Sequence, residues 1–408
     1  MTANVPAEGV SFFTPEQLPP AGTAAASQPD DKPIPALFQP LTIRGLTVQN
    51  RIFVSPMCQY SAKDGKITPW HFAHLGGIFT RGPGLTFTEA TAVLPEGRIT
   101  PEDSGIWSDE HAALWAPIVE FAHSQNQKIA MQLGHAGRKA STIAPWLPGT
   151  NLATTELGGW PDHTYAASPL RFSDDYPLPN EISKQGIKEV VDAFKKAAER
   201  AVKVGFDALE VHGAHGYLLF GFLSPTSNHR TDEYGGIFEN RIRIVLQVID
   251  AIRSVIPPEM PFFYRISGSE NVEQTLPDVP SWRSEDTVRI APILAAHGVD
   301  VLDVSSGGNN SKQKITPGPA YQSPLAHAVK KTNPGLLVAT VGGITDGHTA
   351  QGVLENGLAD VVLCGRAFQQ NPGLVLRYAQ DLDVDIHLAH QIQWGYKMGR
   401  RTRRAKAS

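Results

Sequence analysis

His212, His215 and Tyr217 stand close together in the sequence and could act on one carbonyl group. They belong to the segment His-Gly-Ala-His-Gly-Tyr, directly after an apolar run that ends at Val211. Two ring N–H donors at this spacing could stabilise negative charge on one oxygen, and a phenol, protonated at pH 7, could donate a proton. Two other interpretations stay open, namely hydrogen-bonded structural histidines or a metal pair. Zinc usually takes three or four ligands, and no cysteine or carboxylate stands nearby at ligand spacing, so we expect no metal.

Two glycine turns in the C-terminal half could bind phosphate. They are Val341-Gly342-Gly343-Ile344 and Cys364-Gly365-Arg366, and each follows an apolar run. Bare backbone N–H groups attract an anion, and an arginine can bind one through two parallel hydrogen bonds. A Gly-Gly pair also serves any tight turn. The phosphate interpretation therefore depends on which strands these turns follow.

Gln132 and Arg265 place polar groups where apolar side chains are expected. Gln132 ends one apolar run and Arg265 lies inside another. A flavin ring would use such groups, because it needs donors for its carbonyls and a cation near N1. An ion pair of Arg265 with Glu210 or Asp303 explains the arginine equally well.

The chain has two cysteines, Cys58 and Cys364. That number is too small for a disulfide framework and favours a reducing compartment. An isolated cysteine is often a small buried hydrophobic residue. Cys58, however, follows an apolar run and stands close to Tyr60, so we expect it to belong to a site.

Eight short apolar runs alternate with helical stretches along the chain. The runs are 52–54, 85–88, 128–131, 208–211, 262–266, 301–304, 337–340 and 361–363. The clearest helical periodicity covers 186–204 and 240–254. Near-continuous apolar strands that alternate with helices indicate a buried parallel sheet, and eight such units close a barrel. We therefore predict an α/β fold, a (β/α)8 TIM barrel, whose seventh and eighth strands precede the two glycine turns.

Residues 36–385 are expected to form this barrel domain. Short apolar stretches on either side of Arg44-Gly45 predict an N-terminal hairpin. The Pro- and Gly-rich interval from Gln132 to Ser183 predicts a long lid loop between the third strand and the third helix, because long loops in compact domains are usually functional.

The two ends of the chain differ from the barrel in composition. Residues 1–35 are rich in Pro, Ala, Ser and Thr and predict an extended or disordered arm. Residues 386–408 form a C-terminal segment in which Lys397 to Lys406 carries six basic residues. A solvated tail is the expected role, with a phosphate contact as the alternative.

The composition argues against several classes of partner. A net charge of −4 implies neither a nucleic-acid nor a membrane partner. No secretory signal and no apolar run of membrane-spanning length is visible, so we expect a cytoplasmic protein. The Rossmann fingerprint Gly-x-Gly-x-x-Gly and the P-loop motif are both missing.

At these motifs the sequence closely resembles the Old Yellow Enzyme family of FMN-dependent ene-reductases, most strongly its thermophilic-like, YqjM-type subgroup. The resemblance covers about residues 36–395. It rests on the segments 50–58, 89–93, 132–139, 212–218, 223–236, 239–241, 305–307 and 365–366.

The resemblance implies roles for individual residues. His212 and His215 would hydrogen-bond the carbonyl of the substrate, Tyr217 would donate the proton, and Cys58 and Tyr60 would face the substrate. The expected FMN-binding residues are Pro56, Met57, Cys58, Ala90, Gln132, Arg265, Gly307, Gly343, Gly365 and Arg366.

The resemblance also implies the reaction. NADPH or NADH reduces bound, non-covalent FMN, hydride then passes from N5 to the β-carbon of an activated alkene, and Tyr217 protonates the α-carbon in a ping-pong scheme. The alternatives are a flavin-dependent isomerase or dehydrogenase of natural-product metabolism, a barrel lyase or isomerase without flavin, and a non-catalytic binding protein. The intact Tyr217 favours reduction, since net reduction needs a proton donor.

Three features depart from the family pattern. YqjM-type chains commonly end in a short aromatic segment with an arginine that reaches into the neighbouring subunit's site, so the resemblance implies a homodimer or higher homo-oligomer. Here 393–397 replaces that ending and Arg400 and Arg401 come later. Gly213 stands where alanine is common, which we expect to loosen that turn slightly. The arm before residue 36 has no counterpart in the short bacterial proteins.

Overall fold

The computed structural model describes residues 3–396, and within them eight parallel strands form a closed barrel. The strands are β3 (Ile52–Val54), β4 (Leu85–Ala92), β5 (Ile129–Gly134), β8 (Ala208–Gly213), β9 (Phe262–Ser267), β10 (Val301–Ser305), β11 (Leu337–Val341) and β12 (Val361–Cys364). They are paired in this order, and β12 closes the ring by pairing with β3. All eight predicted runs are barrel strands, so the predicted (β/α)8 barrel is confirmed.

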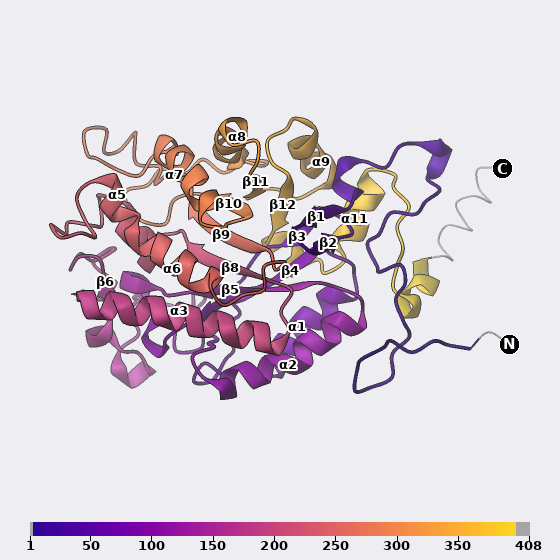
Figure 1. Cartoon of the computed structure of the whole chain (residues 1–408), viewed down its shortest axis with the longest axis horizontal. Coiled ribbons are helices and arrows are strands. Elements are labelled where there is room, and N and C mark those ends of the chain that lie inside the picture. The colour runs from indigo at the N-terminus through magenta and orange to yellow at the C-terminus, as the bar shows by residue number, and fades with distance from the viewer. Residues whose placement is uncertain (1–2, 397–408) are drawn as a thin grey trace.

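Helices surround the barrel and cover its outer face (Figure 1). Those that follow the strands are α1 (Pro69–Phe79), α2 (Asp109–Ser124), α3 (Lys184–Val204), α4 (Leu218–Leu223), α5 (Phe238–Arg241), α6 (Arg243–Arg253), α7 (Ser284–Ala296), α8 (Ser323–Thr332), α9 (Gly347–Glu355), α10 (Arg366–Gln370) and α11 (Leu374–Asp381). Helix α3 begins two residues before its predicted start, because the Ser183 side chain accepts a hydrogen bond from the Gly186 N–H and caps it there. The stretch predicted as one helix over 240–254 is divided at Ile242 into α5 and α6.

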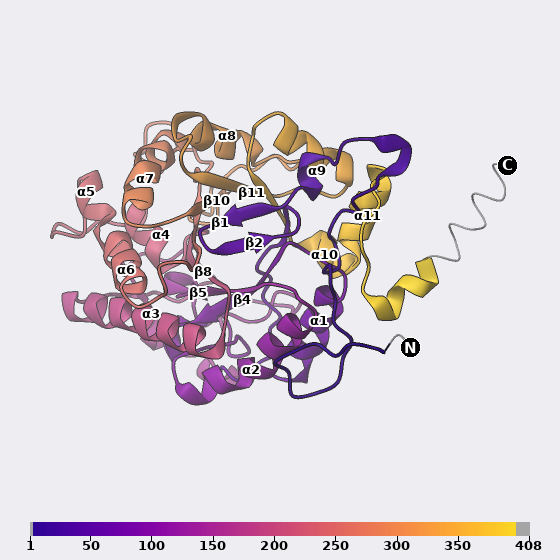
Figure 2. The ribbon, with the colours of Figure 1, turned by 45° about the vertical axis from the view of Figure 1, so that its right-hand side comes forward.

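Apolar side chains fill the end of the barrel at which the strands begin, and a hairpin covers this end. The rings of Phe87 and Phe263 meet edge to face with centroids 5.1 Å apart. Strands β1 (Leu41–Ile43) and β2 (Leu46–Val48) form the predicted hairpin, whose buried Ile43 and Val48 join this cluster. Figure 2 shows the hairpin in front of the barrel strands. A catalytic site is therefore expected at the opposite end of the barrel, where the strands end.

The long loop over residues 135–182 is folded against its neighbours. It contains the short helices η4 (Gly137–Lys139), η5 (Thr155–Leu157) and η6 (Pro161–His163), and β6 (Tyr165–Ala166) pairs with β7 (Asn180–Glu181). The Trp160 indole N–H donates to the Glu96 carbonyl at 3.0 Å, and the Arg98 guanidinium lies over the Trp160 ring, 4.5 Å from its centroid. These contacts tie the loop to the segment that follows β4.

The N-terminal arm runs beside the C-terminal segment, as the indigo and yellow chains show in Figures 1 and 2. Backbone hydrogen bonds join Gly22 N to His387 O at 2.9 Å and Ala25 N to Asp385 O at 2.8 Å. The Gln17 and Gln391 side chains are hydrogen-bonded at 2.9 Å. The basic tail Lys397–Lys406, with Arg400 and Arg401, lies outside the described residues.

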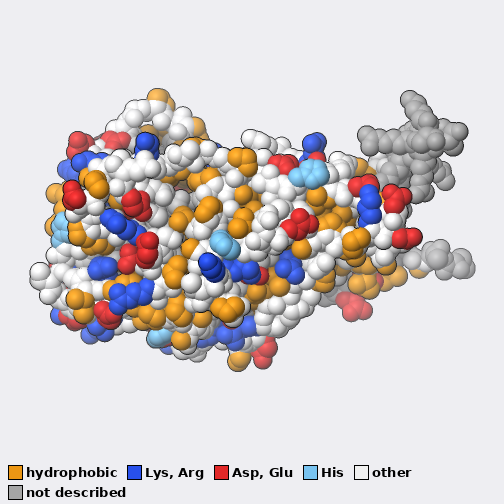
Figure 3. All heavy atoms as spheres, turned by 90° about the horizontal axis from the view of Figure 1, so that it is seen from above, with side chains coloured by type: hydrophobic (Ala, Val, Ile, Leu, Met, Phe, Trp, Pro, Cys, Tyr) orange, Lys and Arg blue, Asp and Glu red, His pale blue; other side chains and the backbone are white. Residues whose placement is uncertain are grey.

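Charged side chains of both signs are interspersed over the face in Figure 3, where no large area carries only one sign. Among the helices of residues 3–396, none combines the length and the apolar character that crossing a bilayer requires.

Candidate active site

His212, His215 and Tyr217 come together at the end of β8. The His212 ring centroid is 5.0 Å from that of His215 and 4.8 Å from that of Tyr217. A cavity beside them is lined by Ala90, Ala92, Gly97, Ile99, Asp103, Gly134, His135, Ala136, His212 and Tyr217. The spacing in the sequence thus corresponds to one cluster, in which His212 and Tyr217 line the cavity and His215 contacts His212.

Both histidines are neutral because of their surroundings. Burial lowers the pKa of His212 and of His215 well below the ordinary 6.5, and the nearby cations Arg265 and Lys139 lower both pKa values further. Burial raises the pKa of Tyr217 well above 10. At neutral pH the cluster therefore holds two uncharged imidazoles and a protonated phenol, which are N–H and O–H donors.

The backbone of His215 is held in a left-handed conformation with a φ of 58°. Its N–H donates to Ser267 Oγ at 2.9 Å, and its carbonyl accepts a hydrogen bond from Lys139 Nζ at 3.0 Å. Lys139 Nζ also donates to the Gly308 carbonyl at 2.9 Å. Such a conformation persists in a non-glycine residue only where the surroundings fix it, and here three segments do so.

Lys139 is a site residue to which we gave no role from the sequence. Its ammonium group lies 5.4 Å from the Tyr217 ring centroid and 4.4 Å from that of Phe172. Burial, and then the charge of Arg138, lower the pKa of Lys139 to about 8. The available signal was its place in the motif 132–139, directly after the third barrel strand.

Asp103 was also missed. It is buried in the wall of the same cavity and accepts hydrogen bonds from the Ile99 N–H at 2.7 Å and from Thr100 Oγ1 at 3.0 Å. Burial, and then the charge of Glu89, raise its pKa to about 7. Nothing in the local sequence marks it, since Asp103 lies in a loop among other polar residues.

Gln132, Glu210, Asp303 and Arg265 form a buried polar layer across four neighbouring strands. Gln132 Nε2 donates to Glu210 Oε1 at 2.7 Å, and Arg265 Nε lies 3.2 Å from Asp303 Oδ2. The ion pair predicted as the alternative role of Arg265 is thus present, with Asp303 as the partner. Burial raises the pKa of Glu210 and of Asp303, and one guanidinium faces both carboxyl groups. We infer that one of the two carboxyl groups stays protonated.

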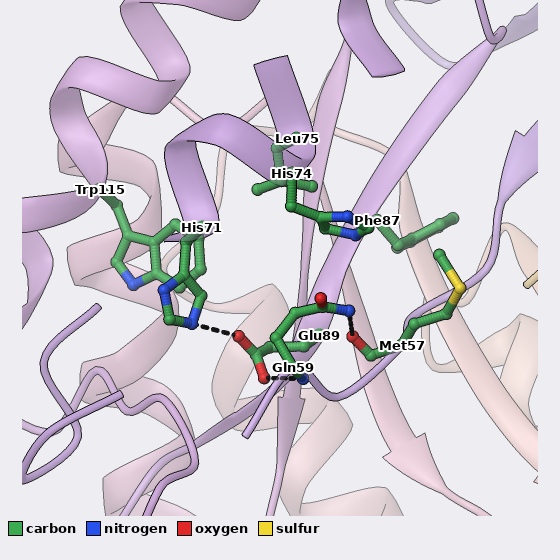
Figure 4. Close-up of a pocket in the computed structure, with 8 residues that line it drawn as sticks. All are labelled: Met57, Gln59, His71, His74, Leu75, Phe87, Glu89 and Trp115. Carbon is green, nitrogen blue, oxygen red and sulfur yellow. Dashed lines mark hydrogen bonds and ion pairs between the residues drawn. The ribbon is translucent and has the colours of Figure 1, made fainter. Parts of the chain in front are cut away.

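A second buried carboxylate fixes the segment that carries Cys58, as Figure 4 shows. The Gln59 N–H donates to Glu89 Oε2 at 2.8 Å, and His71 Nε2 lies 2.8 Å from Glu89 Oε1. Gln59 Nε2 donates to the Met57 carbonyl, also at 2.8 Å. Burial, followed by the charges of Asp103 and Glu89, raises the pKa of Cys58, so Cys58 is a thiol and not a thiolate.

Tyr60 follows in a left-handed conformation with a φ of 48°. Its ring meets that of Trp146 edge to face, with centroids 5.4 Å apart. Trp146 belongs to the long loop and is 64% exposed. The long loop therefore contacts Tyr60, which the family resemblance assigns to the substrate pocket.

The two glycine turns lie side by side because β11 pairs with β12. Gly343 has a φ of 67°, and a Cβ there would lie 1.9 Å from the Gly318 carbonyl oxygen, so only glycine fits. Arg366 begins α10 and is exposed, and its guanidinium has no hydrogen-bonding or ionic partner within the part of the chain that is described. A rigid turn with a nearby unpaired cation suits an anionic ligand.

Gly213, the departure noted between the two histidines, is explained by a neighbouring strand. A Cβ on Gly213 would lie 2.0 Å from the hydroxyl oxygen of Tyr264, which is fully buried on β9. The tyrosine occupies the space that an alanine would need, so this turn is packed and not loosened.

Comparisons with known proteins agree with this architecture. A sequence profile of the family described as "NADH:flavin oxidoreductase / NADH oxidase family" matches residues 36–385. A protein of Gibberella zeae described as NADH:flavin oxidoreductase FG08077 is 51% identical, over 97% of this chain and 96% of its own length. The NADPH dehydrogenase of Bacillus subtilis is 40% identical, over 88% of this chain and 99% of its own. Morphinone reductase superposes with a TM-score of 0.68 at 27% identity, covering 85% of this chain and 90% of its own.

Proposed function

The chain belongs to the NADH:flavin oxidoreductase / NADH oxidase family, the Old Yellow Enzyme family, and from this premise we propose that it reduces the C=C bond of α,β-unsaturated carbonyl compounds. Family membership makes it an NAD(P)H-dependent flavin oxidoreductase. The observation that carries the finer proposal is the cluster of two neutral imidazoles and one protonated phenol at the end of β8, in which His212 and Tyr217 line one cavity and His215 contacts His212.

FMN, which the family implies, fits the residues present. The glycine-only turn at Gly343 and the exposed Arg366, which has no partner among residues 3–396, suit its phosphate. The buried Arg265 suits the ring, where a cation favours the reduced form. When bound, FMN supplies the redox chemistry by taking hydride from NAD(P)H and giving it to the alkene. The residues that we propose hold it are Pro56, Met57, Cys58, Ala90, Gln132, Arg265, Gly307, Gly343, Gly365 and Arg366.

His212 and His215 would bind the carbonyl oxygen of the substrate. Hydride addition to an enone moves negative charge onto that oxygen, and pre-placed N–H donors stabilise the charge without reorganisation. Removing one such donor typically costs about 3–4 kcal/mol in the transition state. Tyr217, on the same cavity wall, would then deliver a proton to the α-carbon. Cys58 and Tyr60 would contact the substrate from the end of β3.

The test begins with the visible spectrum of the purified protein. We expect bound FMN, bleaching by NADPH without oxygen, and recovery of colour when cyclohexenone or a maleimide is added. A colourless protein that cannot be reconstituted with FMN would contradict the proposal. If NADPH bleaches the flavin but neither alkene restores it, a flavin-dependent isomerase or dehydrogenase becomes the better description.

The histidines are tested by His212→Ala. Reoxidation of the reduced flavin by cyclohexenone should slow by about 10²–10³-fold, the usual effect of losing one such donor, with little change in FMN affinity. A variant that loses FMN binding and reoxidation to the same extent would show that His212 supports the fold and not the carbonyl.

A further inference from the structure

The protonation pattern of His212 is fixed by the backbone. The Ala214 N–H donates to His212 Nδ1 at 3.2 Å, so Nδ1 is the acceptor of this neutral ring and the proton lies on Nε2. The nitrogen that carries this proton, His212 Nε2, lies 3.3 Å from His215 Nδ1. His212 therefore donates from Nε2, and this N–H group points toward Nδ1 of His215.

His215 has no such backbone partner for its ring, and its second nitrogen faces a serine. His215 Nε2 lies 2.7 Å from Ser305 Oγ, at the end of β10. The backbone N–H of His215 donates to Ser267 Oγ and its carbonyl accepts from Lys139 Nζ, so the backbone that carries the ring is fixed, while the ring itself is held between His212 and Ser305. What remains adjustable at His215 is which nitrogen carries the proton.

Two arrangements with the same number of protons are possible, and only the first satisfies every contact without a ligand. In the first, His215 Nε2–H donates to Ser305 Oγ, and His215 Nδ1 accepts from His212 Nε2–H. In the second, the Ser305 hydroxyl donates to His215 Nε2, and His215 carries its proton on Nδ1. The second arrangement makes two N–H groups converge, and it becomes favourable when a carbonyl oxygen accepts both.

Gln322 leaves the Ser305 hydroxyl free to choose between these arrangements. Gln322 Nε2 donates to the Val341 carbonyl at 2.7 Å, which directs Gln322 Oε1 toward the two serines. Ser306 Oγ donates to that oxygen at 2.7 Å, whereas Ser305 Oγ lies farther away, at 3.3 Å. Because Ser306 already satisfies Gln322, turning the Ser305 proton toward His215 leaves no acceptor without a partner.

We propose that Ser305 is a positioning residue that sets the tautomer of His215, so that a bound carbonyl substrate receives hydrogen bonds from both histidines. This inference rests on the proposed function, since it assumes that the histidine pair binds the carbonyl oxygen. It adds a residue on β10 to a site otherwise built on β8, and it explains how one of two neutral histidines comes to donate from Nδ1.

Two substitutions at Ser305 and a neighbouring control separate this role from packing. Ser305→Ala removes the hydroxyl, Ser305→Thr keeps it, and Ser306→Ala removes the adjacent hydroxyl that faces Gln322 only. Each FMN-loaded variant is reduced with dithionite and mixed with cyclohexenone. We expect Ser305→Ala to slow reoxidation by about 10–100-fold, less than complete loss of a donor, and Ser305→Thr to stay within about 3-fold of the parent. Ser306→Ala leaves Gln322 Oε1 to Ser305, which then shares its proton with His215, so this variant should slow reoxidation by less than Ser305→Ala does.

The tautomer itself can be observed by nitrogen NMR of histidine-labelled protein, with His215→Gln to assign the signal. Cyclohexanone, a carbonyl ligand with no C=C bond to reduce, should place the His215 proton on Nδ1 in the parent and not in Ser305→Ala. If Ser305→Ala keeps both the parent rate and the parent tautomer while His215→Gln is slow, the role of Ser305 is wrong and the carbonyl site stands. If His215→Gln also keeps the parent rate, His215 does not bind the carbonyl oxygen, whereas a reduced parent that cyclohexenone does not reoxidise would overturn the proposed function itself.

Discussion

The ring of Tyr217 lies edge-on to the ring of His212, with centroids 4.8 Å apart and planes inclined by 68°. The proposed proton donor thus touches one of the two residues proposed to bind the carbonyl. Tyr217→Phe keeps the ring and removes only the proton. Reoxidation of the reduced flavin by cyclohexenone should fall by about 10²–10⁴-fold, the usual contribution of a positioned acid, with unchanged FMN affinity. A phenylalanine variant as fast as the parent would mean that the proton comes from elsewhere.

The pH dependence should come from two neighbours of the cluster. The pKa values of His212 and His215 lie below 6.5 and that of Tyr217 above 10, so these three do not titrate near neutrality. The pKa of Asp103 is raised to about 7 and that of Lys139 is lowered to about 8. As the pH rises, the first gains negative charge and the second loses positive charge, and both changes disfavour an anionic carbonyl oxygen.

We therefore expect the rate constant for reoxidation by enone to fall as the pH rises from about 6 to 9, through the two pKa values above. Asp103→Asn should move the midpoint of this fall upward, and Lys139→Met should move it downward. The measurement is the pH profile of each variant after reduction with dithionite. Two profiles that coincide with that of the parent would show that neither group faces the reacting carbonyl.

The buried polar layer predicts unequal effects of two similar substitutions. Asp303→Asn removes the ion pair with Arg265, and ionised Glu210 would compensate only in part, so the free energy of unfolding should fall by about 1.5–3 kcal/mol. Glu210→Gln keeps the ion pair and can still accept from Gln132, so its effect should be smaller. Chemical denaturation followed by tryptophan fluorescence compares the two variants. A larger loss of unfolding free energy in Glu210→Gln would show that Glu210, and not Asp303, carries the negative charge.

The long loop should influence the choice of substrate through Trp146. Its edge contact with Tyr60 is of a kind that contributes about 0.5–1.5 kcal/mol. Trp146→Ala should raise KM for enones that carry a ring by about 2–10-fold and leave KM for the smallest enones unchanged. Leu147→Ala, which alters the next exposed apolar side chain of the loop, is the matched control. Equal changes for ring-bearing and small enones would argue against a role in recognition.

The barrel could be predicted from the sequence because each strand is a separate apolar run with its own helix after it. The break at Ile242 could not, since the apolar periodicity continues through it. Among site residues, the histidines and Tyr217 were visible because they share one segment. Lys139, Asp103 and Ser305 reach the same site from three other segments, and the contacts of Lys139 and Ser305 with His215 span 76 and 90 residues of sequence. Gly213 depends on Tyr264 in the same way, through a contact that no local pattern contains.

The pairing of the arm with the C-terminal segment has a consequence for how the chain could be rearranged. Residues 22–25 and 385–387 lie side by side, and Gln17 contacts Gln391, so the first and last parts of the described chain are neighbours. Asn50, just before the start of β3, donates to the Gly22 carbonyl at 3.1 Å, so this pairing lies near the beginning of a barrel strand and not at the strand ends that carry the site. A circular permutation that links these neighbours and opens the chain at an exposed loop should therefore fold to the same barrel. The order of the eight β/α units along the chain could then be changed without changing their positions in the barrel.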